Sequence, residues 1–128
     1  MMKQLRSGLA RARGLGSARG GTEDFWRQRV TSVLGLPLVI GLMTAFWFVA
    51  GADYFSARRM VGNPVVAAIV ALAIVNFAVH MRLGAQVIIE DYVHRPVLKP
   101  LMLVVNTGIA YGTATVAILA LIKISALG

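Results

Sequence analysis

Three long apolar stretches constrain the fold of this chain more than any other feature. They run from about residue 30 to 50, from 64 to 89 and from 97 to 122. A helix needs roughly 20 predominantly apolar residues to cross the hydrocarbon core of a bilayer, and each stretch meets that requirement. Pro37 in the first stretch is compatible with a span, because neighbouring helices can pair the backbone group that it leaves free. We therefore predict an all-α membrane protein with three transmembrane helices.

The composition supports a membrane environment. Hydrophobic residues make up 58% of the 128 residues and charged residues only 14%, whereas ordinary soluble domains carry about a quarter charged residues. The net charge is +8, and most of the basic residues precede the first stretch: Lys3, Arg6, Arg11, Arg13, Arg19, Arg27 and Arg29. A basic flank beside an apolar span is typical of the cytoplasmic or matrix side, and we favour that reading over nucleic-acid binding. The bias places the N-terminus and the connection from 91 to 99 on this side and Gly128 on the opposite, periplasmic side.

The chain divides into a tail and an anchor. Residues 1–22 are rich in Arg, Gly, Ser and Ala, and we expect them to form a flexible basic tail. Residues 23–128 would form the three-helix transmembrane domain. The arginine-rich, acid-poor start also resembles an organelle transit peptide, so a mitochondrial origin stays open, whereas a cleaved secretory signal fits less well.

Features that the sequence lacks narrow the function further. The chain contains no cysteine, which excludes disulfides, thiolate-bound iron–sulfur clusters and cysteine nucleophiles within it. No inverted repeat or polar pore stripe is visible, which argues against a channel or transporter. Three helices make a thin bundle with several polar residues at membrane depth. We therefore expect the helices to pack with a partner membrane subunit.

A one-sided stripe of unusual residues runs along the second stretch. His80, Gly84, Val87 and Asp91 fall on nearly one face of a helix, over about 16 Å. Either His80 hydrogen-bonds a neighbouring helix, or it binds haem iron through one ring nitrogen while the other is hydrogen-bonded. An ionisable side chain inside a membrane is a functional-site candidate by default. Gly84, one turn away, would let a flat macrocycle approach the helix backbone.

Other polar residues lie close to His80 in the sequence. Arg82 points to a different face, where it could pair with a haem propionate or extend toward the lipid headgroups. Asn76, one turn before His80, suits an interhelical hydrogen bond better than catalysis. His94 lies in the polar connection, so the spans contain a single histidine. A haem with two histidine ligands would need the second one from another chain.

Asp91 and Tyr92 end the second stretch at the membrane interface. Tyrosines are common at such interfaces, and acids often mark helix ends. A phenol can also donate to a quinone carbonyl, and a nearby carboxylate can help to deliver the protons that quinone reduction consumes. Arg29, just before the first stretch, belongs to an aromatic and basic interface belt or neutralises a reduced quinone or a haem propionate.

Taken together, these residues resemble a known family signature. The pattern is His80-x-x-x-Gly84-x-Gln86-Val87-x-x-x-Asp91-Tyr92-Val93-His94, with Asp24-Phe25 and Arg29 before the first span. It resembles the signature of the hydrophobic membrane-anchor (D) subunit of succinate dehydrogenase. The resemblance covers nearly all of the chain after the basic tail, and its residue spacing is more specific than three helices alone.

The resemblance implies a role for each matched residue. His80 would be an axial ligand of haem b, with the second axial histidine supplied by the cytochrome b (C) subunit. Tyr92 would hydrogen-bond ubiquinone, Asp91 would be the neighbouring acid, and Arg29 would lie near the quinone and the haem. The iron–sulfur subunit would help to complete the quinone pocket, and a flavoprotein subunit would oxidise succinate. The family signature does not include Arg82, so its propionate role rests on its place in the helix.

The function implied by the resemblance is that of a membrane anchor of succinate dehydrogenase, complex II, which is not catalytic alone. Electrons would pass from succinate to ubiquinone, linking the tricarboxylic acid cycle to the respiratory chain in a bacterial or mitochondrial inner membrane. Two alternatives stay open. One is the anchor of a related quinol:fumarate reductase, and the other is a non-catalytic membrane scaffold or assembly protein.

Overall fold

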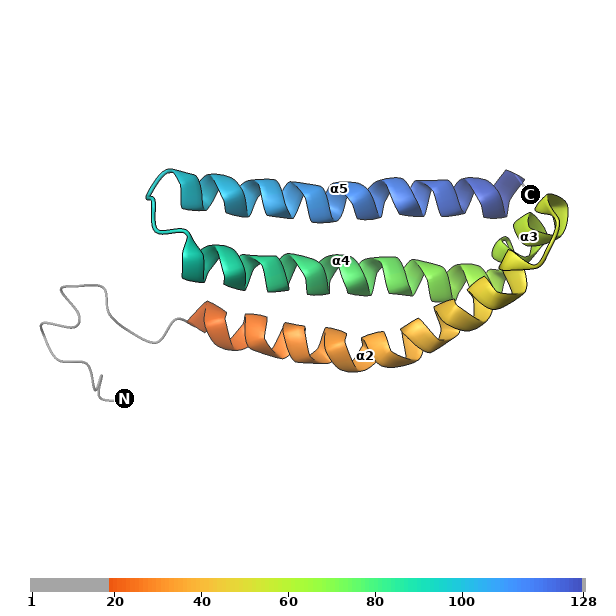
Figure 1. Cartoon of the computed structure of the whole chain (residues 1–128), viewed down its shortest axis with the longest axis horizontal. Coiled ribbons are helices and arrows are strands. Elements are labelled where there is room, and N and C mark those ends of the chain that lie inside the picture. Colours follow the sequence, from red (N-terminus) through yellow and green to blue (C-terminus); the bar gives the residue numbers. More distant parts are fainter. Residues whose placement is uncertain (1–18, 128) are drawn as a thin grey trace, which may run out of the picture.

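Three long helices confirm the predicted all-α membrane architecture. The computed structural model describes residues 19–127, in which the helices are α2 (Arg19–Ala50), α3 (Tyr54–Val61), α4 (Pro64–Tyr92) and α5 (Leu98–Leu127). Helices α2, α4 and α5 are each long and apolar enough to cross a membrane. They alternate in direction along the chain (Figure 1). The start of α2, the end of α4 and the start of α5 therefore share one end of the molecule.

Helix α2 extends well beyond the apolar stretch that predicts it. It begins at Arg19 rather than near residue 30, because the polar segment before the stretch contains no proline and can continue the helix outside the membrane core. Residues 19–22, which were expected in the tail, thus belong to the helix. The flexible tail expected for residues 1–18 lies outside the described residues. Pro37 lies inside α2 without ending it, and the helix curves along its length (Figure 1).

A short helix, α3, occupies the connection between the first two spans. Asp53 caps its start, because the carboxylate accepts hydrogen bonds from the backbone N–H groups of Phe55 at 3.1 Å and Ser56 at 3.3 Å. Hydrogen bonds from the Ser56 side chain and from these N–H groups hold the pKa of Asp53 below its ordinary value of 3.8. Arg58 and Arg59 lie in the last turn, where positive charge favours the helix dipole.

The boundaries of α4 follow from its capping residues. The Asn63 side chain accepts a hydrogen bond from the Val65 N–H at 2.9 Å, and Pro64 occupies the first turn, where its missing N–H costs no hydrogen bond. The helix ends at Tyr92, and Val93 is already extended. With about 1.5 Å of rise per residue, α4 is about 44 Å long and exceeds the hydrocarbon core of a bilayer.

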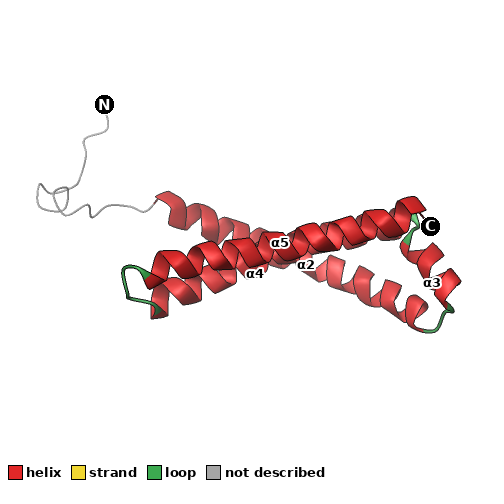
Figure 2. Cartoon of the chain, turned by 90° about the horizontal axis from the view of Figure 1, so that it is seen from above, coloured by secondary structure: helices red, strands yellow, loops and turns green. Residues whose placement is uncertain are grey.

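The three spans form a single layer with α4 in the middle. Helix α4 contacts both α2 and α5, whereas α2 and α5 do not contact each other within the described residues. Seen from above, α2 crosses α4 and α5 obliquely (Figure 2). The few buried apolar residues are Ala73, Leu83, Ile89, Ala110 and Leu121. Most large apolar side chains are exposed, as expected for a membrane protein whose surface meets lipid or another subunit.

Glycines let α2 approach α4 closely. A Cβ atom at Gly35 would lie 3.4 Å from Asn76 Nδ2 and 3.5 Å from Phe77 Cε1. A Cβ atom at Gly41 would lie 3.1 Å from Ile69 Cγ2. Small residues at helix interfaces allow this approach in membranes, where packing and hydrogen bonds drive helix association. The result is direct contact between polar groups of α2 and α4.

Candidate functional site

His80 lies in α4 and faces α2. Its Nδ1 atom is 3.0 Å from Thr31 Oγ1 on α2, and the imidazole is part-buried between the helices. The sequence left two roles open for His80, a hydrogen bond to a neighbouring helix and haem ligation. The structure shows the hydrogen bond and leaves the other nitrogen available, because Nε2 makes no hydrogen bond within residues 19–127.

A second hydrogen bond joins the same two helices one turn away. Asn76 is 8% exposed, and its Nδ2 donates to the Thr31 backbone oxygen at 2.9 Å. This confirms the expectation that Asn76 is an interhelical donor. Thr31 therefore contacts α4 twice, through its backbone oxygen and through its hydroxyl. The close approach at Gly35, one turn after Thr31, brings Asn76 within reach of this oxygen.

The donor set around His80 suits a single-histidine metal ligand. Within the described residues, no group of three or more His, Cys, Asp or Glu side chains could hold a metal ion. A haem iron needs only one axial nitrogen from a chain, since the macrocycle supplies four others. An imidazole with one nitrogen hydrogen-bonded and the other uncommitted fits that requirement.

Gly84 lies one turn along α4 from His80 and also faces α2. A Cβ atom there would lie 3.6 Å from Gln28 Nε2, an ordinary contact distance. The Gln28 Oε1 atom is buried and has no hydrogen-bond partner among the described residues. Gln28 also lines a groove of about 260 Å³ between α2 and α4. An acceptor left unpaired in this groove marks a place where a donor from outside the described residues would bind favourably.

Arg82 lies on the opposite side of α4, toward α5. Its Nε donates to Thr107 Oγ1 at 3.2 Å, and its guanidinium carbon is 5.8 Å from the centroid of the Tyr111 ring. Asn106 donates from its side chain to the Arg82 backbone oxygen at 2.9 Å. The prediction that His80 and Arg82 point to different faces of α4 is thus confirmed, because His80 faces α2 and Arg82 faces α5. All of these contacts of the guanidinium are with neutral groups.

A polar cluster that the sequence reasoning missed lies where α2 begins and α4 ends. Gln86 Nε2 donates to Glu90 Oε1 at 2.9 Å and to Asp24 Oδ2 at 3.3 Å. Asp24 and Glu90 line the same groove as Gln28. Lys99 Nζ donates to the Glu90 backbone oxygen at 3.2 Å, which ties the start of α5 to this end of α4. The signal in the sequence was the helical spacing of Gln86 and Glu90, but their contact with Asp24 depends on tertiary packing.

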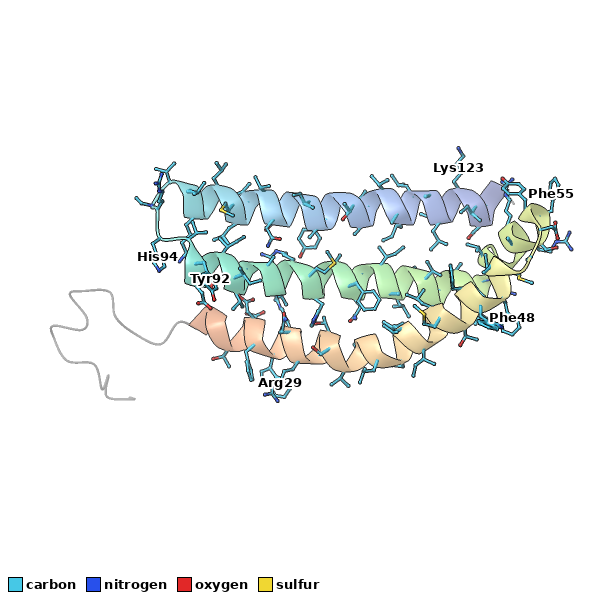
Figure 3. All side chains as sticks on the ribbon, viewed as in Figure 1. Arg29, Phe48, Phe55, Tyr92, His94 and Lys123 are labelled. Carbon is cyan, nitrogen blue, oxygen red and sulfur yellow. The ribbon has the colours of Figure 1, made fainter. Side chains whose placement is uncertain are left out.

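The expected quinone-site residues are close to this end but do not form a closed pocket within residues 19–127. Tyr92 is 80% exposed, and Asp91 and His94 are exposed as well. Arg29 is exposed on the side of α2 that faces away from α4 (Figure 3). Its guanidinium carbon lies 4.7 Å from the centroid of the Phe25 ring, as expected for an aromatic and basic interface belt.

Comparison with known proteins identifies the family. Residues 3–122 match the family described as succinate dehydrogenase/fumarate reductase transmembrane subunit. No curated protein and no solved structure gives a significant match. The family match spans most of the chain and agrees with the three membrane-spanning helices of the structure. The chain belongs to the family of succinate dehydrogenase/fumarate reductase transmembrane subunits.

Proposed function

We propose that this membrane anchor belongs to a succinate dehydrogenase, complex II, and supplies His80 as an axial ligand of haem b and part of the ubiquinone site. The observation that supports the proposal most is the state of His80. It lies within a span, its Nδ1 is hydrogen-bonded to Thr31, and its Nε2 is free of hydrogen bonds within residues 19–127. An ionisable side chain inside a membrane span is a functional-site candidate by default, and the uncommitted Nε2 is the atom that would bind a ligand.

The haem, when bound, would serve as an electron reservoir beside the quinone site. His80 would hold the iron on one side through Nε2. The second ligand would come from the cytochrome b (C) subunit, because the other histidine of this chain, His94, lies in the exposed connection after α4. Gly84 would leave room beside the ring only if the Gln28 side chain, whose Nε2 lies 3.6 Å from the Cβ position of Gly84, moves aside. Arg82 would hold a haem propionate only if that group reaches the α5 side of α4, where its guanidinium lies.

The quinone site would form at the end of α4 against other subunits. Tyr92 would donate a hydrogen bond to a ubiquinone carbonyl, and Asp91 would help to relay protons. The exposure of Tyr92 supports a site that neighbouring subunits complete. Arg29 would act on a quinone or a propionate located on the side of α2 that faces away from α4 (Figure 3). The groove beside Asp24 and Glu90 lies at the same end.

The partners follow from membership in this family. The anchor associates with the other subunits of such a complex, which we propose to be the C subunit, the iron–sulfur subunit and the flavoprotein. The exposed apolar surface of the helix layer would pack against the C subunit and lipid. We propose that α2 begins in the cytoplasm or the mitochondrial matrix and α5 ends on the opposite side, because basic residues concentrate before the first span.

The family match leaves the direction of turnover open, since its description covers succinate dehydrogenase and fumarate reductase. The spacing from His80 to Asp91 and Tyr92 favours succinate dehydrogenase through the resemblance described above. An unrelated scaffold or assembly protein finds no support in the match. Comparing succinate:ubiquinone and quinol:fumarate rates of the same purified complex would separate the two enzymes, and we expect the first to be faster.

The proposal is tested by purifying the affinity-tagged chain from its native membranes in mild detergent. We expect haem b, flavin and non-haem iron to co-purify in a fixed ratio, together with succinate:ubiquinone reductase activity. A complex that carries flavin and iron but no haem b would overturn the ligand role of His80. Isolation of the chain without flavin and without non-haem iron would overturn the assignment to a succinate dehydrogenase complex.

The quinone role is tested with two tyrosine variants in that complex. Tyr92→Phe removes the phenolic hydroxyl at the proposed site, whereas Tyr54→Phe makes the same change at an exposed position at the start of α3. We expect Tyr92→Phe to lower the rate of ubiquinone reduction about 100-fold, the lower end of the contribution of a positioned proton donor. Succinate oxidation by a water-soluble acceptor should stay unchanged. Equal ubiquinone rates in the two variants would contradict the role.

A further inference from the structure

We infer that Thr31 is a positioning residue for the proposed haem ligand: its hydroxyl accepts the Nδ1–H of His80 and thereby keeps the Nε2 lone pair directed to iron. The inference rests on the proposed function, because it deepens the role of His80. It concerns a residue of α2 that lies outside the family pattern described above, and it follows from the hydrogen bonds around a single oxygen atom.

The direction of the hydrogen bond follows from the neighbours of Thr31 Oγ1. This oxygen lies 2.8 Å from the Arg27 backbone oxygen and 3.0 Å from the Gln28 backbone oxygen. Both carbonyl oxygens can only accept, and a hydroxyl has one proton to give. If that proton went to His80 instead, oxygen lone pairs would face each other at both short distances. The Thr31 hydroxyl therefore donates its proton to one of these backbone carbonyl oxygens. In the 3.0 Å contact with His80, Nδ1 is then the donor and the hydroxyl oxygen is the acceptor.

This arrangement selects one tautomer of the neutral imidazole. With the proton on Nδ1, the Nε2 atom carries a lone pair and no hydrogen, which is the form that binds a metal. The other tautomer would place a hydrogen on Nε2 and would need an acceptor there, and none lies within hydrogen-bond distance among the described residues. The structure thus prepares the ligand nitrogen before any iron binds.

The position of Thr31 is itself fixed from two directions. Its hydroxyl is held by the backbone of its own helix, a common arrangement for threonine inside a helix. Its backbone oxygen is held across the interface by Asn76, which lies one turn before His80. The acceptor and the ring therefore keep their relative position through contacts that do not involve the ring. An outer hydrogen bond of this kind orients a ligating histidine and makes it a stronger donor to the metal.

The test compares variants of the purified complex. Thr31→Val and Thr31→Ala remove the hydroxyl, and Thr31→Ser retains it. The alanine variant is smaller than threonine and so gives a result even where the valine methyl group prevents assembly. Thr44→Val is the matched control, because Thr44 makes the same hydrogen bond within α2, to the Ile40 backbone oxygen at 2.8 Å, but is exposed. Each complex is examined for its haem b midpoint potential, the electron paramagnetic resonance g values of its oxidised haem and its haem-to-flavin ratio.

We expect the valine and alanine variants to bind oxidised haem less tightly relative to reduced haem by about tenfold, the lower end of outer-hydrogen-bond effects. For a one-electron couple this is a rise in midpoint potential of about 59 mV. Their g values should shift as well, whereas Thr31→Ser and Thr44→Val should match the wild type. A purely structural role of Thr31 would lower the haem-to-flavin ratio without shifting the potential of the haem that remains.

Two different failures are distinguishable. If the wild-type complex contains no haem b, the proposed function fails. If the wild type contains haem b but Thr31→Val and Thr31→Ala keep its potential and g values, only the role of Thr31 fails. A shift of the same size in Thr44→Val would also overturn the inference, because it would trace the effect to the altered helix backbone and not to His80.

Discussion

The contact of α2 with α4 at Gly35 predicts a graded response to side-chain size. A Cβ atom at this position would lie 3.4 Å from Asn76 Nδ2 and 3.5 Å from Phe77 Cε1. These are ordinary contact distances, so Gly35→Ala should fit without separating the helices. Gly35→Val adds two further methyl groups next to the same neighbours and should push α2 away from α4.

The magnitudes follow from two opposing effects. Replacing glycine by alanine inside a helix favours the helix by about 0.8 to 1 kcal/mol, so Gly35→Ala should be neutral or stabilising. Overfilling a packed interface costs about 1 to 3 kcal/mol, so Gly35→Val should be destabilising. The displacement in Gly35→Val should also lengthen the hydrogen bonds from Asn76 and His80 to Thr31, which lies one turn away.

Thermal unfolding of the purified complex, monitored by absorbance of bound haem and by helical circular dichroism, measures this response. Gly41→Ala provides a comparison within the same helix, because its Cβ atom would lie only 3.1 Å from Ile69 Cγ2. The expected order of unfolding midpoints is Gly35→Ala highest, then Gly41→Ala, then Gly35→Val. Equal midpoints for the two Gly35 variants would refute the close packing on which this reasoning depends.

Three further predictions concern other contacts. Asn76→Leu should lower the unfolding free energy by about 0.6 kcal/mol, the average for interhelical hydrogen bonds in membranes, and by at most about 1.7 kcal/mol. An unchanged thermal midpoint would contradict the contact with Thr31. Because the pKa of Asp53 is lowered in the folded state, its cap should stabilise α3 above pH 3.8 and lose that effect as the pH falls below it. Hydrogen exchange of the α3 amides should show this loss in the wild type and not in Asp53→Ala. Arg82→Met should lower the haem midpoint potential if Arg82 pairs with a propionate, because a nearby positive charge favours the reduced haem; a potential equal to that of the Arg59→Met control would argue against the pair.

Hydropathy predicted the spans because their length and composition are determined by the bilayer. It did not predict α3, because a helix of eight residues with mixed polarity is too short to give a hydropathy signal. Asp53 is nevertheless of a residue type that is preferred at helix N-caps. The early start of α2 at Arg19 was also missed. Polar residues outside the membrane core can continue a helix, but they do not raise the hydropathy by which a span is recognised.

The candidate site was predicted only in part. Helical spacing was sufficient to separate the direction of His80 from that of Arg82 and to suggest Asn76 as an interhelical donor. It could not identify Thr31 as the common neighbour of His80 and Asn76. The spans are apolar on nearly every side, so the rotation of α2 against α4 depends on packing at positions such as Gly35. The contact of Gln86 with Asp24 was unpredictable for the same reason. The completion of a quinone site around Tyr92 depends on other chains, which the sequence of this one does not contain.

The haem b spectrum of the complex carrying His80→Ala tests the central claim most directly. His94→Ala is the matched control, since it removes the other histidine of the chain from an exposed connection. Both complexes are purified by their flavoprotein subunit, so that assembly is measured apart from haem binding. The account predicts that His80→Ala loses or shifts the reduced haem b bands while His94→Ala retains them. An unchanged haem b spectrum in an assembled His80→Ala complex would contradict it.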